Sequence, residues 1–94
     1  LSNSNLAPIP EILAYPNPVA SAPFVRVSYD NVFEPSTVQI VDASGRLYRE
    51  DTFEPAASGN GIFALKVDNL ASGLYIVKLV NRVSKASTKL LIQR

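Results

Sequence analysis

The sequence predicts an all-β fold, an immunoglobulin-like antiparallel β-sandwich of about seven strands. Short runs of alternating apolar and polar residues recur along the chain, turn residues separate them, and no window carries a sustained helical stripe. The chain has 94 residues, which is enough for one domain with a single modest core. The predicted strands span residues 11–15, 24–29, 37–42, 46–53, 62–67, 74–80 and 87–93.

Residues 1–10 are predicted to be a linker, and residues 11–94 the sandwich. The linker is rich in Ser and Asn, and its two prolines disfavour both a helix and a strand ladder. The first strand ends in Tyr15–Pro18, where two more prolines remove backbone donors, so we expect this strand at the edge of a sheet. A proline-ended edge strand can exchange between protomers, which leaves a strand-swapped dimer open as an oligomeric state.

The middle of the chain predicts a hairpin. Val38 and Ile40 share one face of the third strand, and the four residues 42–45 that follow have Asp first and Gly last. This is a turn pattern in which Gly45 takes a positive φ, so the third and fourth strands should pair antiparallel. In the second strand, Val25, Val27 and Tyr29 alternate with polar residues and should face the core.

The C-terminal half continues the alternation. The four residues 70–73 are expected to turn the chain into the sixth strand, and a larger residue at Gly73 should damage the domain if that turn needs a positive φ. In the last strand, Leu91 lies out of phase with Leu90 and Ile92. Tyr75 follows that turn, a position typical of a tyrosine corner, in which the ring is buried and the hydroxyl bonds the backbone upstream. The predicted inward side chains of the fifth and sixth strands are Phe63, Leu65, Val67, Tyr75, Val77 and Leu79.

Composition excludes most catalytic chemistry. The absence of His and Cys excludes Ser-His-Asp and Cys-His catalysis and every metal site with His or Cys ligands. Glu50 and Asp51 are neighbours on a predicted strand and point to opposite faces, so they cannot act as a carboxylate pair. We therefore predict no catalytic, cofactor-binding or metal-binding residues and no enzyme activity. The sequence also lacks Met, which predicts that it is part of a longer precursor.

The charges are nearly balanced, with nine Lys and Arg against eight Asp and Glu. This balance gives no reason to expect nucleic acid as a partner, and no apolar run approaches the roughly 20 residues of a membrane span. Residues 69–94 nevertheless hold five basic residues and no acid, a basic C-terminal quarter whose simplest explanation is a solvated face.

Four segments in order carry a resemblance to one family. They are Tyr15–Pro18, Val38–Arg46, Leu70–Leu79 and Ser87–Ile92. Together they resemble the type A C-terminal sorting domain of proteins that the type IX (Por) secretion system of Bacteroidota exports. The resemblance covers roughly residues 14–93.

The resemblance implies a signal rather than a reaction. Such a domain is covalently linked to an N-terminal cargo, and it directs that cargo across the periplasm to the outer-membrane type IX translocon. A surface sortase then cuts before the domain, here within residues 1–10, and the cargo is anchored at the cell surface or released. By residue type, the candidates for translocon recognition are Gly73, Leu74, Tyr75, Val77, Lys78, Lys89, Leu90, Leu91 and Ile92.

Several alternatives remain at this stage. Leu91 is expected either to be exposed and contact a partner or to pack under a neighbouring loop. A fibronectin-like or carbohydrate-binding accessory module would use the same strands and predicts an exposed aromatic platform. A structural spacer between catalytic domains is a third possibility, which would normally continue into another domain.

Overall fold

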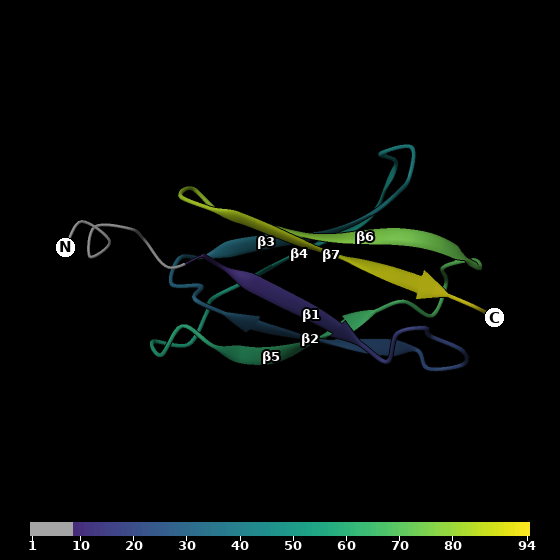
Figure 1. Ribbon diagram of the computed structural model, residues 1–94, viewed down its shortest axis with the longest axis horizontal. Helices are drawn as coiled ribbons and strands as arrows, with labels where there is room; N and C mark the ends of the chain where they lie inside the picture. The colour runs from purple at the N-terminus through teal and green to yellow at the C-terminus, as the bar shows by residue number, and fades with distance from the viewer. Residues whose placement is uncertain (1–8) are drawn as a thin grey trace.

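The computed structural model describes residues 9–94, and they form seven strands and no helix. Three strands make one sheet in the order β1 (Glu11–Tyr15), β2 (Phe24–Asp30) and β5 (Gly61–Lys66). Four make the other, ordered β4 (Leu47–Phe53), β3 (Ser36–Asp42), β6 (Gly73–Val80) and β7 (Lys85–Ile92). The sheets stack face to face with every ladder antiparallel (Figure 1), which confirms the predicted sandwich.

The core lies between the sheets and is built from alternate residues of each strand. On β2, Val25, Val27 and Tyr29 are buried as predicted, and β3 contributes Val38 and Ile40. The fully buried side chains of largest volume are Ile40, Leu65, Leu79, Leu90, Ile92, Val19, Val25, Val27, Val32, Val38, Val67 and Val77.

The strand edges also follow the prediction. β1 lies at one edge of its sheet, next to β2 alone, and the hairpin of β3 and β4 pairs antiparallel with a register shift between Ile40 and Val41. Strand ends differ from the predicted ones by one or two residues: β6 begins at Gly73, and β7 begins at Lys85.

The positive φ considered for Gly73 is not observed, since among the described glycines only Gly45 and Gly59 have one. Gly73 instead starts β6 with a strand backbone, and a Cβ there would meet Tyr75 at 3.7 Å, a normal contact distance. Phe63 points inward as predicted and is half-buried, because it packs at the margin of the core against Phe53.

The hairpin turn is held by one carboxylate. Asp42 accepts hydrogen bonds from the Ser44 hydroxyl (2.6 Å) and N–H (2.9 Å), from the Arg46 N–H (3.0 Å) and from the Tyr48 hydroxyl (3.0 Å). These bonds, chiefly the one from the Ser44 hydroxyl, lower the pKa of Asp42 from its usual 3.8 to about 2. Gly45 takes the predicted positive φ of 91° in the same turn.

We expect this turn to lose stability in acid. A pKa depressed in the folded state stabilises the fold above the pKa of the unfolded chain, and this contribution is lost as pH falls from about 4 toward 2. The Asp42→Asn variant should therefore show a smaller drop in melting temperature over that interval than the unmodified protein. Melting curves at matched pH values check this, and parallel pH profiles would contradict it.

Candidate functional site

All nine candidate recognition residues lie on β6 and β7, which are neighbouring antiparallel strands. In their register Gly73 is opposite Ile92, Leu74 is opposite Leu91, and Tyr75 is opposite Leu90. The two sequence segments are thus placed side by side, although Gly73 and Lys89 are 16 positions apart in the chain.

The candidates divide into inward and outward groups. Tyr75, Val77, Leu90 and Ile92 point into the core and are at most 5% exposed, so a partner of the folded domain cannot touch their side chains. Leu74, Lys78, Lys89 and Leu91 lie on the outer face of the four-stranded sheet, where the first three are exposed and Leu91 is half-buried. Gly73 has the strand phase of the inward residues, opposite Ile92, and offers no side chain to a partner.

Tyr75 forms the predicted tyrosine corner. Its ring is buried, and its hydroxyl donates a hydrogen bond of 2.7 Å to the carbonyl oxygen of Ala71, before the start of β6. The ring also meets Tyr48 edge-on, with centroids 5.4 Å apart. Tyr75 therefore fixes the entry of the chain into β6 and has a structural role.

The segment Asn17–Val19 is bonded to the outer edge of β7, which the sequence did not reveal. The Asn17 side chain donates to the Lys89 carbonyl (2.9 Å) and accepts from the Leu91 N–H (3.0 Å). Val19 donates to the Leu91 carbonyl and accepts from the Gln93 N–H, each at 2.8 Å. Both backbone groups of Leu91 are thus bonded to this segment, while its side chain is half-buried on the outer face.

Arg94 does not belong to a solvated basic face. Its guanidinium donates to the carbonyl oxygens of Val67 (2.6 Å), Leu70 (2.9 Å) and Ala20 (3.2 Å), and its N–H donates to the Ser72 hydroxyl (2.8 Å). These bonds hold the end of the described chain against the loops before β2 and β6.

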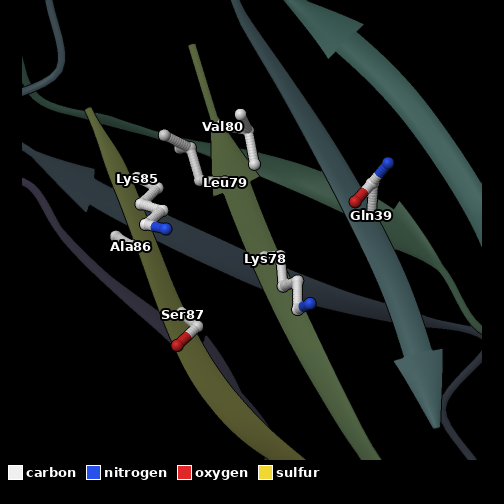
Figure 2. A pocket seen from close by; sticks show the side chains of 7 residues that line it. All are labelled: Gln39, Lys78, Leu79, Val80, Lys85, Ala86 and Ser87. Carbon is white, nitrogen blue, oxygen red and sulfur yellow. The ribbon is translucent and has the colours of Figure 1, made fainter. Parts of the chain in front are cut away.

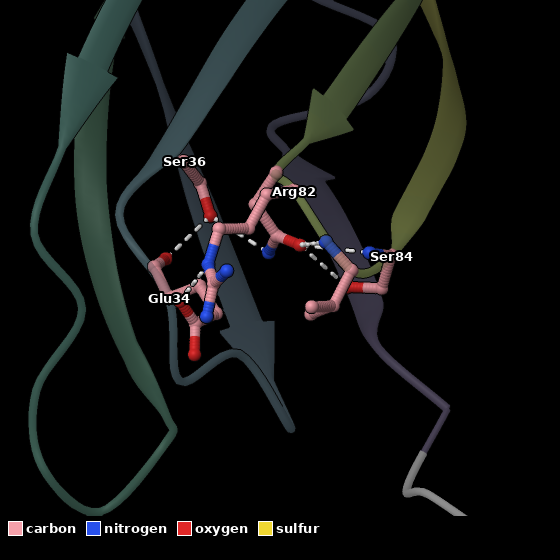
Figure 3. A network of polar contacts seen from close by, with 6 residues as sticks. Glu34, Ser36, Arg82 and Ser84 are labelled. Atoms are coloured by element: carbon pink, nitrogen blue, oxygen red, sulfur yellow. Dashed lines mark hydrogen bonds and ion pairs between the residues drawn. The ribbon is translucent and has the colours of Figure 1, made fainter.

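Arg82 is also engaged, in a polar network beside the turn between β6 and β7 (Figure 3). Its Nε donates to a carboxylate oxygen of Glu34 at 3.0 Å. Next to it, the Asn81 amide donates to the hydroxyl of Ser36, a side chain only 3% exposed, and Asn81 accepts from the Ser84 N–H and hydroxyl. The network connects the start of β3 to this turn.

The remaining cations of the basic quarter are Lys78, Lys85 and Lys89, all exposed. Within residues 9–94 none of them forms an ion pair. Because Lys78 is opposite Ser87, it lies diagonal to both Lys85 and Lys89 on the same outer face. We call these three side chains the lysine cluster.

A shallow hollow of about 540 Å³ lies at the lysine cluster, over β3, β6 and β7 (Figure 2). Gln39 closes one side, and its amide donates to Glu50 on β4 at 2.8 Å. The residues that line the hollow are Gln39, Lys78, Leu79, Val80, Lys85, Ala86 and Ser87. The surface thus combines positive charge with hydrogen-bonding and apolar groups.

The described part of the chain shows no metal site and no membrane-spanning helix. It holds no group of three acidic, His or Cys side chains that a metal ion could use, and none of its segments is a helix suited to crossing a membrane. Each buried side-chain N or O atom in residues 9–94 has a hydrogen-bond partner, so no unsatisfied group points to a missing ligand.

Comparison with known families identifies the domain. The model of a family described as the secretion system C-terminal sorting domain (Por_Secre_tail) matches residues 13–93. The chain belongs to this family. No curated protein and no solved structure gives a match.

As a type IX sorting domain, the chain implies a linked N-terminal cargo, the type IX machinery as partner, and a protein that is secreted or displayed at the cell surface. The family is not an enzyme family. The match covers the four segments that carried the resemblance and begins at Leu13, inside β1.

We expect the tyrosine corner to contribute directly to the stability of the sorting domain. Tyr75→Phe keeps the buried ring but leaves the Ala71 carbonyl without its partner, which should lower the free energy of unfolding by about 1–2 kcal/mol. Urea unfolding checks this, with Tyr15→Phe as the control, because the Tyr15 ring is 38% exposed. Equal losses in both variants would contradict a special role for the corner.

Proposed function

We propose that residues 11–94 are a sorting signal that the outer-membrane type IX translocon recognises through the outer face of β6 and β7. Residues 1–10 then act as the linker to the cargo, and a surface sortase cleaves within them after transit through the periplasm. Most of that linker, residues 1–8, lies outside the described residues. The observation that carries the proposal is the lysine cluster, which lies beside exposed Leu74 in a chain of the sorting family.

The division of β6 and β7 supports recognition by the outward residues only. The inward side chains of β6 and β7 are buried in the core. They stabilise the fold, and the fold holds the outward side chains in place. Lys78, Lys89 and Leu74 are available to a partner, and three unpaired cations on one face favour an acidic surface by charge complementarity.

Export of a reporter tests the proposal. Residues 1–94 are fused behind a signal peptide and a fluorescent protein in a Bacteroidota host with a working type IX system. Single substitutions are easier to interpret than a truncation, because removal of residues 89–94 would also remove Leu90 and Ile92 from the core and disturb folding.

We expect Lys89→Glu to weaken export while it changes the melting temperature by little, because Lys89 is exposed and forms no ion pair within residues 9–94. The matched control is Arg26→Glu, which reverses an exposed charge on β2 of the other sheet that likewise forms no ion pair within residues 9–94. Equal export of the two folded variants would remove the lysine cluster from the mechanism, and periplasmic retention of the unmodified fusion would overturn the sorting function.

A second function is favoured by one observation, on the opposite sheet. The exposed rings of Tyr15 and Phe24 line a hollow of about 330 Å³ together with Pro16, Arg26 and Ala64. Aromatic faces beside a cation are a surface that suits sugars, as the accessory-module alternative predicts.

Glycan binding is tested by retention of the purified domain on immobilised neutral and anionic polysaccharides. If this surface binds sugars, Phe24→Ala should abolish the retention without unfolding the domain, because the Phe24 side chain is 49% exposed. An unmodified domain that passes through every matrix without retention would overturn this second function.

A further inference from the structure

The outer edge of β7 is only half occupied. Both backbone groups of Leu91 point away from β6, toward Asn17 and Val19. Because backbone groups alternate in direction along an antiparallel strand, those of Ser87 and the N–H of Lys89 also point away from β6. In the described part of the chain no hydrogen bond occupies the N–H or C=O of Ser87 or the N–H of Lys89.

Space is open beside this free stretch. A hollow of about 290 Å³ lies between β1 and β7, and Ala86 and Ser87 line it from the β7 side. Across the hollow are Pro10, Glu11, Ile12 and Leu13. The first strand therefore lies next to β7 here without forming a ladder with it, whereas Asn17–Val19 closes the edge farther along.

The length of the free stretch limits what can bind. From Lys85 to the bonded Lys89 carbonyl, the edge of β7 runs for five residues, about 17 Å of strand. An extended segment of four or five residues can add there before it meets Asn17. Strand addition to an exposed edge is a common form of peptide recognition, in which the ladder bonds supply affinity and alternate side chains supply specificity.

The charges beside the free edge specify the chemistry of the added segment. Lys85 and Lys89 lie four residues apart on the outer face, with Ser87 between them and Lys78 behind it on β6. Neither β6 nor β7 carries an acidic residue. Glu11, which lines the hollow, lies on the outer face of the other sheet, since its neighbour Ile12 points into the core.

We infer that residues 85–89 dock an extended acidic segment of the translocon by strand addition. Acidic side chains at positions i and i+4 of that segment face Lys85 and Lys89, and a side chain at i+2 faces Ser87. This inference rests on the sorting function proposed above and names the form of the partner at that site.

A proline substitution tests the contribution of the backbone edge of β7 without changing the lysine charges beside it. Ser87→Pro removes the outward N–H and blocks the ladder, but breaks no hydrogen bond of the described structure, since proline is tolerated where a strand N–H faces solvent. Ser87→Thr is the matched control, which keeps the N–H and a hydroxyl. We expect reporter export of Ser87→Pro to fall about tenfold, the effect of losing one or two hydrogen bonds, with normal export of Ser87→Thr.

The outcomes separate the two proposals. Normal export of a folded Ser87→Pro variant would overturn strand addition and leave the sorting function intact, whereas retention of the unmodified fusion would overturn both. Amide hydrogen exchange of the unmodified domain with detergent-solubilised translocon gives a readout that does not need the proline variant to fold. The Ser87 and Lys89 amides should become protected, while the Leu91 amide, already bonded to Asn17, keeps its exchange rate. Binding that leaves the Ser87 and Lys89 amides unchanged would refute the inference.

Discussion

The burial of Leu90 and Ile92 between the two sheets is the interaction on which the rest of the molecule depends. These side chains are at most 1% exposed and lie on the last strand, opposite Tyr75 and Gly73 of β6. Burial of each side chain is worth about 1.5–3 kcal/mol, a large share of the stability of a domain of this size. The core is therefore complete only when β7 is in place, and the outer face of β6 and β7 exists only in the folded domain.

Strand alternation connects this core to the surface. The same two strands that bury Tyr75, Val77 and Leu90 display Lys78 and Lys89 on their other face. The recognition signal proposed for these strands is a folded surface rather than a linear peptide. Under this proposal, a change at an inward position alters both folding and recognition, whereas a change at an outward position acts on recognition alone.

Much of the fold could be predicted from local pattern. Alternation placed all seven strands within two residues of their observed ends, and Asp42 with Gly45 placed the hairpin turn. These signals succeeded because each depends on residues within a few positions of one another. The positive φ considered for Gly73 is absent, and the turn before β6 is instead bonded through the Tyr75 hydroxyl to Ala71.

The contacts that could not be predicted from the sequence are hydrogen bonds between segments far apart in the chain. Asn17 and Leu91 are 74 positions apart, and the Arg94 guanidinium reaches carbonyls 24, 27 and 74 positions away. No local period encodes such pairs. In the sequence, residues 15–18 predict the end of a strand and begin the family resemblance, but nothing there shows that the asparagine between the two prolines occupies the edge of β7. Arg94 and Arg82 counted as basic surface in the sequence, although both hold loops together.

When Arg82 and Arg94 are left out of the basic C-terminal quarter, the remaining charges are distributed asymmetrically across the outer face of the four-stranded sheet. One row of neighbours runs from Glu50 on β4 through Gln39 and Lys78 to Ser87 on β7, so negative charge lies at one edge and the lysine cluster at the other. A face with such a gradient orients an acidic partner before contact and turns it toward the β7 edge. At 0.1 M salt, exposed charges attract or repel a charged partner over roughly 10 Å, which is about the distance across two or three strands. In the proposed docking, charge thus selects the edge, and the unoccupied backbone groups within residues 85–89 determine where along that edge the partner binds.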